Sequence, residues 1–295
     1  MNIGVGLPTT IRGTNRQLII EWATRADSGP FSSLGVLDRL VYDSYDPLVA
    51  LASAAAVTRR VQLATTIIVS LLHPTTLLAK TTASLHALSG GRLIVGLSVG
   101  ARKDDYAAAG IDYEARGKRF AAQLAALQAA WEDERICPQT AHTGSPPVLV
   151  GGASDQSYAR MARYAAGYIH GGGPPRSFAR AADRARAAWI DAGRPGKPRL
   201  WGQGYFAFGD AAIEAGTRYL RDYYAFTGPF AERIAAELLT SPQAVAQFIR
   251  GYEEAGCDEL ILFPAAADIA QLELLAAIAV TLQQERVAPA EGSIL

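Results

Sequence analysis

Residues 63–100 read LATTIIVSLLHPTTLLAKTTASLHALSGGRLIVGLSVG. This stretch carries most of one buried-type apolar run, residues 61–69, and the whole of another, residues 93–97. Between them, Pro74 predicts the start of a helix, because proline fits a first helical turn, and the two glycines 90 and 91 predict its end. The segment therefore predicts two parallel strands joined by a crossover helix.

The same alternation continues in both directions along the chain. Six further apolar runs are separated by longer, alanine-rich amphipathic segments: residues 3–7, 33–37, 147–150, 167–170, 200–208 and 259–263. Eight strand and helix units in 295 residues predict one (β/α)8 TIM barrel domain over residues 1–295. The alternative, a doubly wound dinucleotide-binding sheet, usually has about six strands.

Further helices are predicted at residues 160–166, 178–192 and 243–255. Residues 136–146 form a poorly patterned linker, and residues 210–241 are longer than one crossover helix requires. The latter block is predicted to form two helices with an aromatic elbow at its Gly228-Pro229 break. Its aromatic residues are either a helical lid over the barrel mouth or ordinary core: Tyr219, Tyr223, Tyr224, Phe226 and Phe230.

Composition restricts the classes of partner. The chain has 28 lysines and arginines together, and 28 aspartates and glutamates together. Its net charge is therefore zero, and no overall electrostatic field attracts nucleic acid or an anionic membrane surface. We therefore expect small-molecule partners. No apolar run approaches the about 20 residues that cross a bilayer, and no export signal precedes the first strand. The two cysteines, Cys137 and Cys257, lie far apart, which fits a cytoplasmic protein without disulfides.

Chemistry in a (β/α)8 barrel takes place at the carboxyl ends of the strands, which limits the candidate residues. The four histidines have no metal-ligand spacing, and no metal site is expected. We expect His73 at a helix start, His86 in a structural role, and Arg102 with Lys103 as surface cations. The remaining candidates at the strand ends are Asp38, Arg39, Ser98, Gly100, His170 and the loop of residues 151–154.

The loop Gly151-Gly152-Ala153-Ser154 joins a strand to a helix that begins near Asp155. Its backbone amides converge at the positive end of a helix dipole, an arrangement that binds phosphate. Ser154 and Ser157 would add hydroxyl contacts, with Ser154 also the expected N-cap. The alternative is a tight turn capped by serine, and the short motif alone leaves both open.

Two other predicted strands carry candidate residues for the barrel mouth. Gly96 and Gly100 bracket the fourth strand, where glycine lets a flat ligand lie against the backbone with Ser98 at its edge, or simply permits dense packing. His170 is aimed into the mouth by its place at the end of the sixth strand. The chain has no Gly-x-Ser-x-Gly elbow and no P-loop lysine, which disfavours hydrolases and kinases. A redox or lyase barrel remains, although a sugar-phosphate lyase or isomerase would need a catalytic lysine or glutamate at the strand ends, where none is well placed.

Residues 63–100 closely resemble the luciferase-like flavin monooxygenase superfamily. The HP, LAK, LSGGR and GxxxG elements occur in that family's order and spacing, and residues 34–39, 151–154 and 256–260 look similar too. The resemblance implies a flavin-dependent oxidoreductase or monooxygenase with reduced FMN or coenzyme F420 across the barrel mouth. It places the cofactor phosphate on Gly152, Ala153, Ser154 and Ser157.

The resemblance also implies a non-prolyl cis peptide under the flavin ring, at Thr65-Thr66 by alignment on His73-Pro74. One departure is consequential: many members carry histidine where this chain has Arg39 after Asp38. Arginine is no proton acceptor near neutral pH, but it stabilises anionic oxygen, or it forms a rim ion pair with Asp38.

Two further expectations come from the resemblance. Members are commonly homodimers through barrel helices, and a monooxygenase of this kind receives its reduced cofactor from a separate flavin or deazaflavin reductase. Because the usual histidine is missing, a catalytically silent flavin-binding accessory protein is the alternative function.

Overall fold

The computed structural model describes residues 1–138 and 144–287. Within them, eight parallel strands close into a barrel in sequence order, with β8 pairing back to β1. The predicted single-domain TIM barrel is confirmed, and the doubly wound sheet is wrong. The strands are β1 (Asn2–Gly6), β2 (Ser33–Val36), β3 (Gln62–Val69), β4 (Leu93–Ser98), β5 (Val148–Gly151), β6 (Gly167–Ile169), β7 (Arg199–Phe206) and β8 (Glu259–Pro264).

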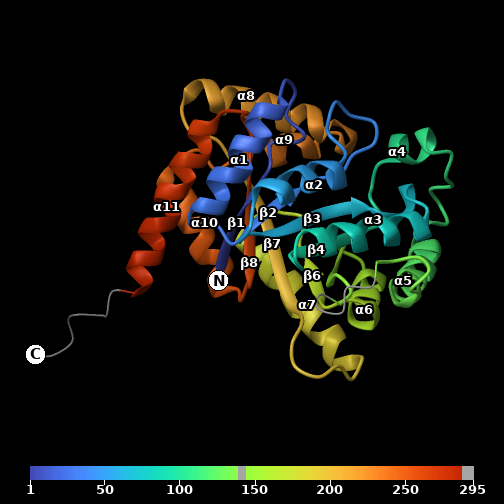
Figure 1. Cartoon of the computed structure of the whole chain (residues 1–295). Helices are drawn as coiled ribbons and strands as arrows, with labels where there is room; N and C mark the ends of the chain where they lie inside the picture. The colour runs from blue at the N-terminus through green and yellow to red at the C-terminus, as the bar shows by residue number, and fades with distance from the viewer. Residues whose placement is uncertain (139–143, 288–295) are drawn as a thin grey trace, which may run out of the picture.

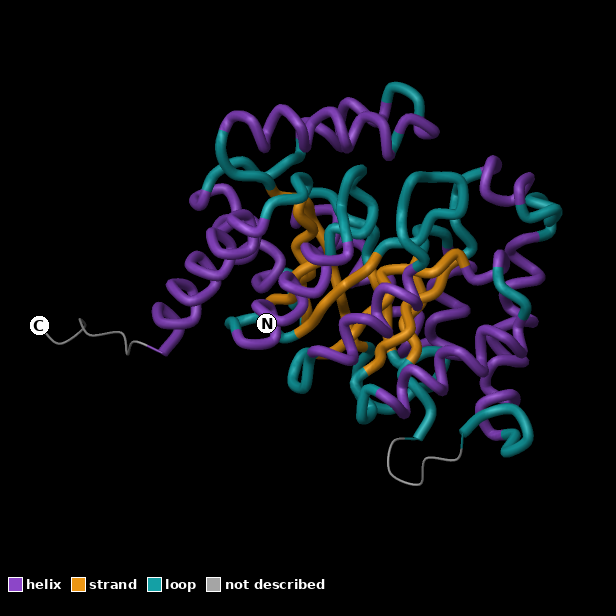
Figure 2. The backbone as a smooth tube through the Cα atoms, turned by 45° about the horizontal axis from the view of Figure 1, so that its top comes forward, coloured by secondary structure: helices purple, strands orange, loops and turns teal. Residues whose placement is uncertain are grey.

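Helices surround the barrel on its outside (Figures 1 and 2). The α-helices are α1 (Arg16–Ser28), α2 (Pro47–Val57), α3 (Thr75–Leu88), α4 (Lys103–Ala108), α5 (Arg116–Glu132), α6 (Asp155–Tyr164), α7 (Pro175–Asp191), α8 (Asp210–Tyr223), α9 (Phe230–Ala236), α10 (Pro242–Glu254) and α11 (Ile269–Val287). Two short 3-10 turns, η1 (Ser70–Leu72) and η2 (Ala225–Thr227), follow β3 and α8.

Two apolar layers hold these elements together. The inner layer fills the barrel with side chains such as Ala64, Ile94 and Ile261, each at most 3% exposed. The outer layer lies between strands and helices and includes Trp22 and Phe178, both fully buried. Because every strand is covered on both faces, its sequence is a continuous apolar run rather than an alternating one.

One predicted helix is displaced. The helix expected at residues 160–166 is α6, Asp155–Tyr164, because the side chain of Ser154 caps its first turn and Ala165 is already extended. Helix α3 also begins one residue later than expected, with Pro74 as its N-cap rather than its first residue. The predicted linker at residues 136–146 lies partly outside the described residues.

Helices α8 and α9 lie across one end of the molecule (Figure 1). They are joined through η2 at Gly228-Pro229, so the predicted pair of helices with an aromatic elbow is confirmed. The backbone of Phe206 bridges to Leu239, which fixes the return of this block onto the end of β7.

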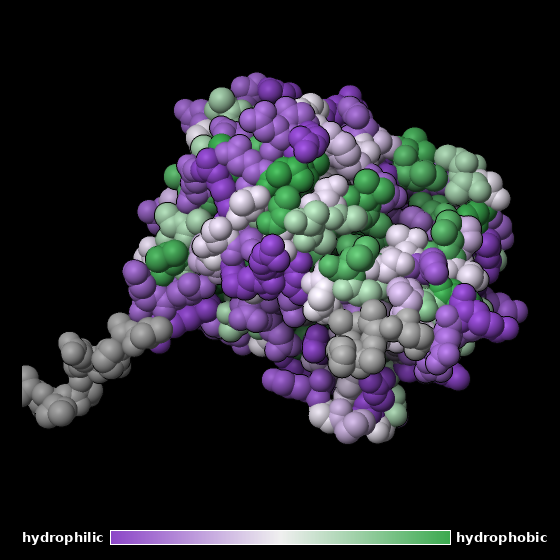
Figure 3. All heavy atoms as spheres, in the orientation of Figure 1, coloured by the Kyte–Doolittle hydropathy of each residue, from purple (hydrophilic) through white to green (hydrophobic). Residues whose placement is uncertain are grey.

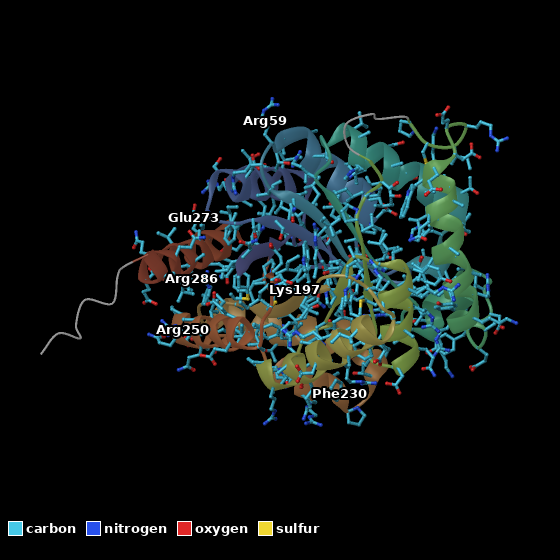
Figure 4. All side chains as sticks on the ribbon, turned by 90° about the horizontal axis from the view of Figure 1, so that it is seen from below. Arg59, Lys197, Phe230, Arg250, Glu273 and Arg286 are labelled. Carbon is cyan, nitrogen blue, oxygen red and sulfur yellow. The ribbon has the colours of Figure 1, made fainter. Side chains whose placement is uncertain are left out.

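The carboxyl-terminal helix packs beside α1 and α10, near the amino terminus. Arg250 of α10 pairs with Glu285 at 2.7 Å, and Arg286 of α11 pairs with Glu253 at 2.8 Å (Figure 4). These pairs are partly or largely exposed, and such pairs contribute at most about 1 kcal/mol each. No helix in the described ranges is long and apolar enough to span a membrane.

An apolar face lies over α2 and α3, where Figure 3 shows hydrophobic side chains gathered on a mostly hydrophilic surface. We call it the α2–α3 face and define it by Val49, Val57, Leu77 and Leu88, which are 37% to 85% exposed. Single exposed apolar residues are ordinary, whereas these four lie on two adjacent helices.

Candidate functional site

A cavity of about 550 Å³ opens at the carboxyl ends of the strands. Residues at the ends of β2 to β7 form its walls and floor, and Tyr223, Tyr224 and Phe226 of the α8–η2 block cover it. The cavity lies where ligands bind in barrels of this type. Several of the site residues predicted from the sequence meet here.

The end of β3 forms part of the cavity floor. The non-prolyl cis peptide lies between Thr66 and Ile67, so its predicted position at Thr65-Thr66 is wrong by one residue. The pairing of β3 with β4 is regular up to Thr65 and shifts register between Thr65 and Ile68, which places the irregular peptide one residue further along.

The two threonines therefore differ in their surroundings. Thr66 lines the cavity and its hydroxyl donates to the carbonyl of Val36 at 3.2 Å. The hydroxyl of Thr65 instead bridges the backbone of Gly96, accepting from its N–H at 2.8 Å and donating to its carbonyl at 2.9 Å. Thr65 is not among the cavity residues, because its side chain is used to join β3 to β4.

The two glycines in and after β4, Gly96 and Gly100, are required by different local geometry. A Cβ at Gly96 would lie 2.2 Å from the Thr65 carbonyl oxygen, so dense packing explains this position. Gly100 lines the cavity with a φ of +67°, and its N–H donates to the hydroxyl of Ser98 at 3.1 Å. Ser98 and Gly100 form part of the cavity floor.

The loop after β5 both caps a helix and faces the cavity. Residues 151–154 and Ser157 all line the cavity wall. The hydroxyl of Ser154 accepts from the Ser157 N–H at 3.2 Å and lies 3.0 Å from the Ser157 hydroxyl. Gly152 has a φ of +126°, and a Cβ there would lie 2.5 Å from Ser157 Oγ. The two sequence interpretations, capped turn and anion cradle, are therefore compatible.

Two side chains that sequence reasoning missed hold this loop in place. Arg184 of α7 donates to the carbonyl of Ala153 at 3.0 Å and pairs with Asp155 at 2.5 Å. The Tyr168 hydroxyl donates to the carbonyl of Gly152 at 3.0 Å. Burial raises the pKa of Tyr168, so this hydroxyl remains a donor. With these two carbonyls engaged, the loop is fixed before a ligand arrives.

His170 lies in the cavity wall at the end of β6, as predicted. Its Nε2 is buried without a hydrogen-bond partner among the described residues, and its Nδ1 lies 3.5 Å from the Tyr168 hydroxyl. Burial lowers the pKa of His170 from 6.5 to about 4. The imidazole is therefore neutral at pH 7 and has one nitrogen free for a ligand.

Gln203 of β7 lines the cavity and was missed from the sequence. Its amide donates to the carbonyl of Gly171 at 3.0 Å, while its Oε1 is buried without a partner among the described residues. The sequence could have indicated Gln203, because a polar residue inside the apolar run 200–208 would be buried and would need a hydrogen-bond partner.

Asp38 and Arg39 do not act together, so the predicted rim ion pair is wrong. Asp38 lines the cavity and accepts from the N–H of Val69 at 2.8 Å, with His73 Nε2 at 3.7 Å from the same oxygen. Arg39 pairs with Asp104 at 3.2 Å and does not line the cavity.

The guanidinium of Arg39 lies behind the cavity roof. It stacks 4.5 Å from the ring centre of Tyr42 and donates to the carbonyl of Tyr223 at 3.3 Å. Arg39 does not line the cavity, so its position does not support the predicted catalytic role, which stays a prediction. The same contacts make Arg39 a support for the end of α8.

Arg102 is not a surface cation, which corrects the sequence prediction. It is 7% exposed and lines the cavity. Its guanidinium lies 4.5 Å from the ring centre of Tyr223 and 4.1 Å from that of Phe226, and it donates to the Tyr223 carbonyl at 2.8 Å. Burial lowers the pKa of Arg102. Lys103, in contrast, is exposed as expected.

A second, smaller cavity of about 120 Å³ lies under α9. It shares Gly171, Gly172 and Tyr224 with the main cavity, and Phe230 and Phe248 give it apolar walls. The Tyr224 hydroxyl lies 2.7 Å from that of Tyr205. Tyr224 is thus the side chain that separates the two spaces.

Solved structures share this architecture. A monooxygenase from Streptomyces bottropensis superposes with a TM-score of 0.77 at 22% identity, covering 96% of this chain and all of that one. An F420-dependent secondary alcohol dehydrogenase, solved with an F420-acetone adduct, superposes with a TM-score of 0.76 at 16% identity, covering 95% of this chain and 98% of that one. At these identities the likeness concerns the fold.

Sequence comparison gives the family. An uncharacterised protein of Mycobacterium tuberculosis is 32% identical over 174 residues, which span 52% of this chain and 60% of the relative. The family model of the luciferase-like monooxygenases matches residues 1–280. The chain therefore belongs to the luciferase-like monooxygenase family.

Proposed function

We propose that this protein is an oxidoreductase that binds reduced FMN or coenzyme F420 in the main cavity and acts on a small organic substrate there. The observation that carries the proposal is the loop of residues 151–154, which lines the cavity with its backbone and Ser154, beside Ser157 of α6 and next to the floor of β3 and β4. The fold neighbours include both a monooxygenase and an F420-dependent dehydrogenase, which is compatible with either cofactor.

The residues present fit such a cofactor. The loop after β5 and the hydroxyls of Ser154 and Ser157 would hold its phosphate at the start of α6. Thr66, Ser98 and Gly100 would lie along its ring system. The bound cofactor supplies hydride transfer or oxygen activation, and the barrel supplies binding, orientation and exclusion of water.

The other cavity residues would accept a proton, orient the substrate and exclude water. Asp38 is the one carboxylate in the main cavity among the described residues, so we assign it the acceptance of a proton. His170, neutral at pH 7, and Gln203 offer unpaired nitrogen and oxygen atoms that orient a ligand by hydrogen bonds. Tyr223, Tyr224 and Phe226 act as the lid and keep water from the reacting atoms.

Anaerobic titration with reduced FMN and with reduced F420, followed by absorbance or fluorescence, tests the proposal. We expect one of the two to bind in the micromolar range and Ser157→Ala to weaken that binding. Absence of binding by either cofactor at high micromolar concentration would refute the proposal.

A catalytically silent accessory protein is the second candidate. It is favoured by one observation: Arg39 replaces the expected histidine and lies outside the cavity. This candidate predicts cofactor binding without turnover. Oxidation of the bound reduced cofactor that depends on an added organic substrate would eliminate it.

We also propose two partners. A separate flavin or deazaflavin reductase would supply the reduced cofactor. A second copy of the chain would cover the α2–α3 face, whose exposed apolar side chains otherwise remain in contact with water.

A further inference from the structure

Arg102 is a buried cation that forms no ion pair within the described part of the chain. No carboxylate lies within 4.0 Å of its guanidinium among the residues that the structure describes. Its Nη2 donates to the Tyr223 carbonyl, but its Nη1 is buried and has no hydrogen-bond partner in the same residues. Leaving a buried charged donor unpaired is strongly destabilising. A donor in this state, in the wall of a cavity, is a binding group for an anion.

The neighbouring charged side chains act on Arg102 only without direct contact. Arg39, which contacts the same Tyr223 carbonyl, is paired with Asp104. Asp105 is buried close by, but its Oδ1 accepts from the N–H of Val41 at 2.7 Å. Asp38, across the cavity, is held by the backbone of Val69. The Oδ2 of Asp105 has no hydrogen-bond partner among the described residues, and the charge of Asp105 favours the charged form of Arg102. No acidic group near the cavity forms an ion pair with Arg102, however, so its Nη1 remains available for a ligand.

The side chains around Arg102 also indicate the chemical character of the uncharged part of the ligand. Tyr223 and Phe226 hold the guanidinium between their rings, so its position is fixed by stacking rather than by an ion pair. Tyr224 continues this aromatic cover, and Leu37 and Ile67 present apolar surface inside the cavity. Flat apolar surface next to a fixed cation suits an aromatic acid.

We propose that Arg102 determines substrate specificity and that the substrate is an aromatic carboxylate whose carboxyl group pairs with the guanidinium of Arg102. The proposal rests on the proposed function in one respect, because it takes the anion in the cavity to be the substrate. The competing source of the anion is the cofactor, whose own phosphate or carboxylate groups would satisfy the same nitrogen.

The test uses matched pairs of ligands on the full chain. Benzoate and 2-naphthoate are compared with benzamide and 2-naphthamide by calorimetric titration, in the cofactor-free protein and in the protein loaded with the cofactor that binds. The amides keep the ring and lose the charge. We expect each acid to bind at least about 10-fold more tightly than its amide, as a charge-assisted hydrogen bond requires.

Three variants test whether Arg102 causes the preference for acids over amides. Arg102→Met keeps an apolar side chain between the two rings and should abolish the preference for acids, whereas Arg102→Lys should restore part of it. Arg39→Met is the matched control, because Arg39 supports the same carbonyl from outside the cavity and its loss should leave the preference intact. The comparison of acid with amide in the unmodified protein requires no variant, so it remains decisive if Arg102→Met does not fold.

Several outcomes would overturn the proposal. These are failure of every acid to bind, equal binding of acids and amides, or a preference that survives in Arg102→Met. A loss of cofactor affinity of about 10-fold in Arg102→Met, with no preference for acids in the loaded protein, would assign Arg102 to the cofactor. If neither cofactor binds but the acids bind through Arg102, the proposed function fails while the anion site stands.

Discussion

Gly152 connects backbone conformation with ligand binding at a single position. Its φ of +126° favours glycine, and a Cβ would meet the Ser157 hydroxyl at 2.5 Å. Gly152→Ala should therefore cost about 1–2 kcal/mol of folding free energy through strain and displace Ser157 from the cavity wall. We expect cofactor affinity to fall about 10-fold or more.

Gly209→Ala is the matched control for this strain. Gly209 also has a positive φ, +87°, but a Cβ there would meet no atom within 4 Å. Gly209→Ala should reduce the melting temperature about as much as Gly152→Ala does and leave cofactor affinity unchanged. Equal losses of affinity in both variants would contradict a specific role for the loop of residues 151–154.

His170 predicts a pH dependence of stability. Its pKa is about 4 in the folded protein and 6.5 in the unfolded chain, so protonation favours unfolding. The contribution of neutral His170 is complete above pH 6.5 and is lost as the pH falls from 6.5 toward 4. Because the ring is only partly buried, we expect a loss of about 2 kcal/mol across this range.

His170→Gln should remove this pH-dependent loss. Urea unfolding of both proteins at pH 7.0 and pH 4.5 measures it, since contributions of other groups cancel in the difference between the two proteins. Parallel changes in the two proteins would show that burial does not hold His170 neutral.

Residue roles were predictable where the backbone alone determines them. Ser154 as a helix cap and Gly152 in a turn follow from the local sequence, and both are present. Arg102 and Gln203 were missed because their burial depends on segments distant in sequence: α8 covers Arg102, and Gln203 is held by the carbonyl of Gly171. The cis peptide was predicted one residue too early, because the alternation of residue types does not reveal the register shift between Thr65 and Ile68.

At the scale of elements, α8 is anchored by its last turn. The Tyr42 hydroxyl donates to Asp222 at 2.6 Å, and Arg12 pairs with the same carboxylate at 3.1 Å. Burial and the negative charge of Asp222 raise the pKa of Tyr42 to about 12, so this hydroxyl stays protonated. Arg39 and Arg102 both donate to the carbonyl of Tyr223 at the carboxyl end of the helix, where cations are stabilising.

Tyr42→Phe should loosen this anchor without disturbing the barrel. A hydrogen bond to a carboxylate contributes about 1.5–3 kcal/mol, and the loss should be local to the end of α8 and η2. Hydrogen exchange followed by mass spectrometry should show faster exchange in residues 220–230 and unchanged exchange in the barrel strands. Tyr45→Phe is the control, because its hydroxyl donates to the carbonyl of Thr14. Unchanged exchange in residues 220–230 would mean that Tyr42 does not hold the lid.

Elements were predicted best where both strand faces are buried. The eight apolar runs match the eight strands because helices cover the barrel on the outside and its own side chains fill the inside. The ends of the strands were predicted less well. The apolar run expected to reach residue 208 ends as β7 at Phe206, because the N–H of Ala207 donates to the carbonyl of Leu239. The short helix α4 was not predicted, since six residues give too little periodicity.

At the scale of the whole molecule, the α2–α3 face predicts a homodimer. Leu77 is 60% exposed in the single chain, so a charge there does not disturb the core of the monomer. Leu77→Glu should place like charges together at the proposed interface and shift the protein to a monomer in sedimentation equilibrium. Ile190→Glu, at a residue 73% exposed on α7, should leave the association unchanged. A monomeric unmodified protein would contradict the prediction.

The closed barrel was predictable because the count and length of the apolar runs leave few alternatives. The arrangement of α8 and α9 over its mouth was not, because the five aromatic residues of the block 210–241 are compatible with a core as well as with a lid. Their places differ in the structure: Tyr219 is buried beside the hydroxyl of Thr10, whereas Tyr224 and Phe226 face the cavity.

Tyr224 gives the molecule a removable partition. It borders both the main cavity and the smaller one under α9, which otherwise meet at Gly171 and Gly172. Shortening this one side chain would join the two spaces into a longer chamber reaching Phe230 and Phe248. An engineer seeking to admit bulkier molecules would therefore begin at Tyr224, leaving the floor and the loop of residues 151–154 untouched.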